Sequence, residues 1–171
     1  MFATTRIHHR LRRKFAIATA CLLPFVNASD AATTTSNFTV QVSITASCTI
    51  NSASTLNFGS QGVLAANVDQ TSTLQVQCTN TTPYNIGLDA GTGSGATVAV
   101  RKMTSGVATV NYSLYSDSGR TTVWGNTVST DTVAATGNGA AQSYTVYGRV
   151  PSQTTPAPGT YTDTITVTVT Y

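Results

Sequence analysis

The 171-residue sequence predicts an all-β fold, an antiparallel β-sandwich, on three observations. Several short segments alternate between apolar and polar residues with a period of two, which is typical of strands that have one buried face. Turn-forming residues separate these segments at regular intervals. No segment has helical periodicity, and the abundant residues Thr, Val, Ser and Gly are poor helix formers.

The first 28 residues have the pattern of a secretory signal peptide. Five basic residues between Arg6 and Lys14 are followed by an apolar stretch over 15–26 and then by small residues. That apolar stretch is too short to cross a bilayer as a helix, so an uncleaved membrane anchor is the less favoured alternative. We expect cleavage after residue 28, with Ala31 or Ala32 as alternative sites, and export of the mature chain.

Removal of this leader changes the charge of the protein. The mature chain keeps four basic and six acidic residues, a formal net charge of −2, and loses both histidines. A nucleic-acid or anionic-membrane partner requires a basic patch, and four scattered cations do not form one. We therefore expect neither partner and no direct insertion into a membrane. The four cations are Arg101, Lys102, Arg120 and Arg149.

The mature sequence contains no catalytic equipment that we recognise. Ser-His-Asp and Cys-His arrangements need a histidine, and the chain has no Glu, so paired carboxylates could come only from Asp. The glycine-rich segment Asp89–Gly95 superficially matches a phosphate-binding loop, but such loops open a helix and this one precedes strand-like residues. One carboxylate at Asp89 is also a weak start for a calcium site. We predict no enzyme activity, no cofactor and no metal.

Two cysteines, Cys48 and Cys78, remain after the leader and its Cys21 are removed. An exported chain meets an oxidising compartment, so a disulfide between them is the default expectation. The closed loop of 30 residues would stabilise the fold by roughly 3–4 kcal/mol. Two free buried thiols are the alternative, and zinc is disfavoured because no histidine completes a ligand set.

The alternation places the strands along the chain, although it does not give their order in the sheets. Loops are expected over 129–141 and over the Pro-rich residues 151–159, and a turn at Asp117–Arg120. The predicted strands are Phe38–Ile50, Leu56–Phe58, Leu74–Cys78, Tyr84–Leu88, Ala96–Arg101, Val110–Leu114, a short piece around Val123 and Trp124, Tyr144–Gly148 and Ile165–Tyr171.

Both ends of the mature chain carry unusually regular one-sided strands. The apolar residues of the N-terminal one are Phe38, Val40, Val42 and Ile44, and those of the C-terminal one are Ile165, Val167, Val169 and Tyr171. An extended N-terminal arm next to a mobile terminus can complete the sheet of a neighbouring molecule. The same residues can equally be the first strand of their own sheet, and periodicity alone does not separate the two interpretations.

Beyond the alternation, a series of short motifs resembles the spore coat protein U family, which includes the major pilins of archaic chaperone–usher pili. The resemblance covers nearly all of the mature chain, and its specificity comes from the order and spacing of the motifs. They are Phe38–Val42, Leu56–Gly59, Val76–Thr79, Pro83–Tyr84, Gly87–Gly91, Tyr112–Asp117, Trp124–Gly125, Tyr147–Pro151 and Gly159–Thr164.

The resemblance implies an incomplete immunoglobulin-like sandwich that a donor strand from a neighbouring subunit completes. Residues 1–28 would be the signal peptide, 29–44 the extension with the donor strand, and 45–171 the pilin-like domain. The donor strand would consist of Phe38, Val40, Val42 and Ile44, and the groove edge and chaperone-pairing strand of Ile165, Val167, Val169 and Tyr171.

The resemblance also implies a function. The partners would be further copies of the chain, a periplasmic chaperone and an outer-membrane usher. The protein would pass through the periplasm to the cell surface and there form pili that support attachment and biofilm formation.

Three other interpretations remain open. The first is a spore or cell-coat protein of the same fold that forms no pilus. The second is a secreted glycan-binding module, in which Trp124 with Tyr112 or Tyr115 would stack on sugars, although core packing is the favoured role for Trp124 and Tyr112. The third and least favoured is an enzyme.

Overall fold

The computed structural model describes residues 30–171, so the predicted leader, residues 1–28, lies outside the described residues. The chain divides between Gln41 and Val42 into two units, which are described separately. In the first unit, residues 30–41 are exposed and form neither strand nor helix. The second unit contains the strands β1 (Cys48–Ala53), β2 (Val68–Cys78), β3 (Pro83–Leu88), β4 (Arg101–Ser105), β5 (Ala108–Tyr115), β6 (Val133–Thr136), β7 (Ala141–Val150) and β8 (Val167–Thr170).

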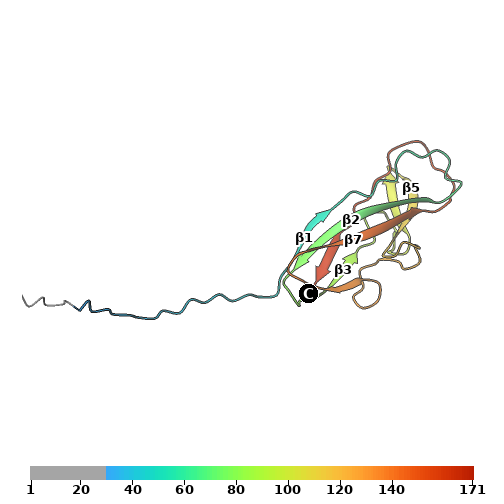
Figure 1. Cartoon of the computed structure of the whole chain (residues 1–171). Helices are drawn as coiled ribbons and strands as arrows, with labels where there is room; N and C mark the ends of the chain where they lie inside the picture. The colour runs from blue at the N-terminus through green and yellow to red at the C-terminus, as the bar shows by residue number, and fades with distance from the viewer. Residues whose placement is uncertain (1–29) are drawn as a thin grey trace, which may run out of the picture. The chain divides into compact units, whose positions relative to one another are not determined.

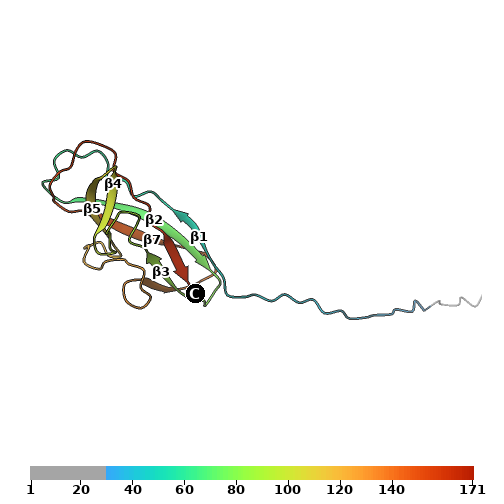
Figure 2. The ribbon, with the colours of Figure 1, turned by 180° about the vertical axis from the view of Figure 1, so that it is seen from behind.

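These strands form two antiparallel sheets. The larger sheet has the order β1-β2-β7-β5-β4, and the smaller sheet has the order β6-β3-β8. The red strand β8 can be followed to the C-terminus in both ribbon views (Figures 1 and 2), and it lies near β1. Before β8, the chain passes β4, where Thr104 and Thr162 form a bridge with two backbone hydrogen bonds. The C-terminal segment therefore contacts both sheets.

The core lies between the two sheets and follows the alternation of the strands. In β2 the buried residues are Leu74, Val76 and Cys78, and the residues between them are less buried. The other buried apolar side chains come from both sheets and from loops; they are Leu64, Tyr84, Ile86, Leu88, Val110, Tyr112, Leu114, Trp124, Val146 and Val150. This packing confirms the predicted all-β sandwich.

One predicted strand, Leu56–Phe58, is wrong, and a glycine of β7 explains why. Leu56 and Phe58 are partly buried against the core but form no strand. A Cβ atom at Gly148 would lie 2.7 Å from Leu56 Cδ1 and 3.0 Å from Phe58 Cζ. The two apolar side chains therefore pack onto the backbone of β7, and their spacing of two reflects this contact and not strand pairing.

Two further boundaries differ from the prediction. Residues 96–100 turn instead of extending, with the amide of Thr97 donating to the carbonyl of Val100, and the strand begins only at Arg101. Strand β6, which pairs with β3, falls inside the loop predicted over 129–141. Its four residues, Val-Ala-Ala-Thr, are too small and too uniform to show an alternation.

Arg101, at the start of β4, is fully buried without an ion pair among the described residues. Its guanidinium donates to four backbone carbonyls, those of Leu88, Asp89, Val98 and Trp124, at 2.7–2.9 Å. Burial lowers the pKa of Arg101, while Tyr112 and nearby aspartates oppose that shift. An arginine side chain stays protonated in proteins. This single cation therefore ties the end of β3 to two loops.

Candidate functional site

The four apolar residues of the predicted arm are exposed to solvent. Phe38 and Val40, in the first unit, and Val42 and Ile44, in the second, keep 78–88% of their surface accessible. Residues 38–47 belong to no strand. The alternative interpretation, in which residues 38–44 are the first strand of their own sheet, is therefore wrong for this structure.

Strand β8 is the end strand of the smaller sheet. One edge of its backbone pairs with β3, in a register that places Val169 opposite Ile86 and Val167 opposite Leu88. No strand of residues 30–171 pairs with its other edge. Val167 and Val169 are half-buried against the core, whereas Thr168 and Thr170 are exposed. Such an edge presents unpaired backbone groups to which another strand can add.

Strand β1 is the end strand of the larger sheet and lies near β8. Apart from half-buried Cys48, its residues are exposed, and Ile50 keeps 42% of its surface accessible. Both sheets therefore end on this side of the sandwich. We call the neighbouring edges of β1 and β8 the open edge.

Of the four residues predicted for the C-terminal edge strand, three are half-buried and one is not. Ile165, Val167 and Val169 pack against the core, whereas Tyr171 is 59% exposed. Only residues 167–170 form the strand itself. Ile165 and Tyr171 therefore flank β8 and are not part of it.

Asp89 fixes the chain just before β8. One oxygen of its carboxylate, Oδ1, accepts hydrogen bonds from the amides of Gly91 and Thr166, both at 3.0 Å. The amide of Asp89 in turn donates to the carbonyl of Thr166 at 3.1 Å. Burial acts to raise the pKa of Asp89, but these hydrogen bonds and the charge of Arg101 lower it below its usual value. The carboxylate therefore stays ionised and holds β8 next to β3.

A second carboxylate, that of Asp163, anchors the same segment to the glycine-rich loop. Its Oδ1 accepts hydrogen bonds from the amide and hydroxyl of Thr92 and from the amide of Thr164, each at 2.8 Å. Its Oδ2 accepts one from the Tyr112 hydroxyl at 2.8 Å. Burial, followed by this hydrogen bond, raises the pKa of Tyr112, so the phenol remains a donor. Hydrogen bonds from the loop over residues 89–95 thus hold in place the segment that leads to β8.

Replacement of Gly91 by Ala is expected to weaken the attachment of this loop to Asp163. The added Cβ would lie 2.1 Å from Asp163 Oδ2, and the backbone there has φ +78°. We expect the free energy of unfolding to fall by about 3 kcal/mol or more, because the Asp163 side chain must move and break its hydrogen bonds, and because alanine is strained in this left-handed backbone conformation. Urea unfolding of the purified subunit measures the loss.

Gly139 provides the matched control for this substitution. It also has positive φ, +82°, but no heavy atom lies within 4 Å of an added Cβ. Gly139→Ala is expected to cost only the backbone strain, about 1–2 kcal/mol. Equal losses in the two variants would show that the contact with Asp163 contributes nothing.

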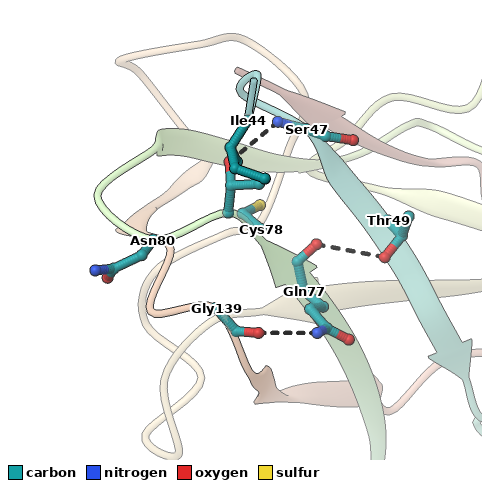
Figure 3. A pocket seen from close by; sticks show the side chains of 8 residues that line it. Ile44, Ser47, Thr49, Gln77, Cys78, Asn80 and Gly139 are labelled. Atoms are coloured by element: carbon teal, nitrogen blue, oxygen red, sulfur yellow. Dashed lines mark hydrogen bonds between the residues drawn. The ribbon is translucent and has the colours of Figure 1, made fainter. Parts of the chain in front are cut away.

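The predicted disulfide between Cys48 and Cys78 is present, with a Cα–Cα distance of 4.1 Å. It lies beside a pocket of about 470 Å³ (Figure 3). Most of the residues that line it are polar in type, and none has an ionisable side chain; they are Ile44, Ser47, Thr49, Gln77, Cys78, Thr79, Asn80 and Gly139. Several of these groups already bond to one another, as when Gln77 donates to the Gly139 carbonyl at 2.9 Å. We assign no chemistry to this pocket.

Two of the aromatic residues considered for sugar stacking, Trp124 and Tyr112, are buried. Trp124 is 1% exposed, and its indole N–H donates to the Ile86 carbonyl at 2.8 Å. Tyr112 is also buried. Both therefore fill the core, and a sugar platform built on Trp124 is wrong for this structure. Among residues 30–171, no group of three or more His, Cys, Asp or Glu side chains is arranged to hold a metal ion.

The comparison with known proteins identifies the family. The model of the Spore Coat Protein U domain matches residues 34–168. The chain belongs to this family. Protein U of Myxococcus xanthus is 34% identical in an alignment 171 positions long, and this alignment covers 91% of this chain and 95% of that protein. The family resemblance seen in the motifs is thus confirmed.

A solved structure supports the fold. A chain in the crystal structure of the CsuC–CsuE chaperone–tip adhesion subunit pre-assembly complex, from archaic chaperone–usher Csu pili of Acinetobacter baumannii, matches with a TM-score of 0.56 and 22% identity. The match covers 75% of this spore coat protein U domain chain and 40% of that longer chain. At this identity the likeness establishes the fold, an antiparallel immunoglobulin-like sandwich. Within residues 30–171, no helix has the length and apolar character needed to cross a membrane.

Sequence reasoning missed the residues that hold β8 in place. Asp89, Gly91 and Asp163 all lie in motifs that carry the family resemblance, but the motifs gave them no structural role. Their partners are up to 77 positions apart, as for Asp89 and Thr166. An aspartate directly before a glycine-rich loop is the available signal, and the sequence alone does not show that this aspartate holds a distant strand in place.

Proposed function

We propose that this spore coat protein U domain protein is a structural subunit that polymerises by donor-strand complementation. Each copy would insert residues 35–44 along the open edge of the next copy. One observation carries the proposal: four alternating apolar side chains are exposed on an unpaired arm, in a subunit whose strand β8 has an unpaired edge. An added strand gains backbone hydrogen bonds from the edge, and its alternate side chains enter the core.

The energies are sufficient for a fibre without covalent links. Burial of Phe38, Val40, Val42 and Ile44 would contribute roughly 1.5–3 kcal/mol each, or about 6–12 kcal/mol together as an upper bound. Backbone pairing along β8 would add roughly 0.5–1.5 kcal/mol per hydrogen bond. Both figures are already net of the contacts that the exposed arm makes with water.

The proposal includes the route to the surface. An unpaired apolar edge is an aggregation hazard, so we infer that a periplasmic chaperone covers it until an outer-membrane usher exports the subunit. The matched solved structure, a complex of a chaperone with a pilus tip subunit, supports this route. The fibre would serve surface attachment and biofilm formation. We propose domain limits of 1–28 for the signal peptide, 29–44 for the arm and 45–171 for the sandwich.

A coat component that forms no pilus is the second candidate. It is favoured by the 34% identity with Protein U and by the family, which is named for a spore coat. Both candidates can use the same strand exchange. They differ in the product, because a pilus subunit gives thin fibres that require the usher, whereas a coat subunit gives a layer.

Deletion of residues 34–44 tests the proposed polymerisation. The intact exported protein is expected to run as a ladder on an unboiled SDS gel and as a single band after boiling. The deleted protein should fold and keep its disulfide, because residues 34–44 form no strand, but it should run as one band in both lanes. A ladder that persists without the arm would contradict the proposal. Electron microscopy of usher-deficient cells separates fibre from coat.

A further inference from the structure

The disulfide lies where the arm enters the domain. Cys48 is the first residue of β1, and only residues 45–47 separate it from the end of the arm at Ile44. Its partner, Cys78, is the last residue of β2 and stands directly opposite in the register. Apart from two hydrogen bonds between Ser47 and Thr79, any pull on the arm therefore reaches the disulfide before it reaches the strands.

Without the disulfide, little would hold β1. Five residue pairs join β1 to β2, and the register shifts between Ile50 and Ser52. All residues of β1 after Cys48 are exposed. The next side chains that pack on the core are Leu56 and Phe58. The strand is thus attached mainly by backbone hydrogen bonds at an irregular edge.

Beyond the disulfide, the chain leads directly to the strand that supports the open edge. Cys78 is separated by four residues, 79–82, from β3, and β3 pairs with β8. These four residues are well fixed. The amide of Thr79 donates to the Ser47 carbonyl at 2.9 Å, and Thr81 and Thr82 each share a backbone hydrogen bond of 2.8 Å with Gly137.

We propose that the Cys48–Cys78 disulfide is the element that carries tension through an assembled fibre. Force that enters a subunit through its arm passes from Cys48 across the disulfide to Cys78, then to β3 and β8, where the next arm is bound. The sequence separation of 30 places 29 residues between the cysteines, and these residues stay outside the force path. The inference rests on the proposed polymerisation, since only a polymer loads the arm and the open edge together.

Pulling single fibres before and after reduction tests the inference. Fibres are assembled with the disulfide intact, then reduced with a phosphine, and alkylation with mass measurement shows that both thiols are free. Fibres of a Cys48→Ser/Cys78→Ser subunit are pulled in parallel, and either preparation decides the question. Oxidised fibres should break before the 29 residues between the cysteines unfold, so their extension should not include the length of these residues. Fibres without the disulfide should first lengthen, by up to roughly 100 Å per subunit at 3.3–3.6 Å per residue.

Two results would count against the inference in different ways. Fibres that depend on the arm, but extend and break alike with and without the disulfide, would overturn this inference alone. Absence of fibres from the unaltered protein, or fibres that persist after deletion of residues 34–44, would overturn the proposed function and this inference with it.

Discussion

A Val42→Asp subunit is expected to accumulate as a soluble, folded protein and to form no fibres. Val42 is 80% exposed in the subunit, so a carboxylate there stays hydrated and changes the free energy of unfolding little. In a fibre the same side chain would lie against the core of another copy, where an unpaired carboxylate is strongly unfavourable. Val40→Asp should behave in the same way. The measurement is paired: the level of soluble subunit, and surface fibres counted by electron microscopy.

Gln41→Asp is the matched control, because residue 41 points to the opposite face of an extended strand. This variant should assemble nearly normally, since in the proposed fibre only one face of the arm would enter the neighbouring molecule. Loss of the soluble Val42→Asp subunit would make the arm a core strand of its own domain. Normal fibres from Val42→Asp would show that the arm does not insert at all.

The arm also shows how far the sequence can predict this structure. A period of two records which side chains will be buried, but it does not say against which molecule. An arm for a neighbour and a first strand of the same sheet therefore have the same pattern. In the structure Phe38 to Ile44 is exposed and strand pairing begins only at Cys48, which argues against a first strand of the same sheet and leaves the arm as the proposal.

Segments with strong alternation were predicted well, and segments fixed by distant contacts were not. Strands β2, β3, β5 and β7 contain the predicted residues, although all four are longer than predicted, β2 and β7 most of all. The buried cation was not predictable, because the carbonyls that Arg101 meets come from residues as far away as Trp124. The role of Asp163 likewise depends on Tyr112, 51 positions away. No local pattern encodes such contacts.

Val169→Asp is expected to remove the subunit before any assembly step. Val169 lies in β8, is half-buried against the core and is paired with Ile86 of β3. Strand β8 has only four residues and one neighbouring strand. A carboxylate there must lose much of its hydration, which we expect to lower the free energy of unfolding by about 3 kcal/mol or more. That is a large share of the 5–15 kcal/mol typical of a folded domain. Immunoblotting should show little or no periplasmic subunit, and deletion of Val169–Tyr171 should have the same effect.

Thr168→Asp supplies the control, because Thr168 is exposed on the other face of β8 and pairs with Gly87. Its subunit should accumulate and assemble, since the new charge stays in water. The pair separates two roles for the C-terminal strand. If Val169→Asp accumulates like Thr168→Asp and still forms fibres, β8 is a frayed tail, and the arm must bind another part of the molecule. If only Val169→Asp is lost, β8 is needed to fold the subunit, as the supporting strand of the open edge must be.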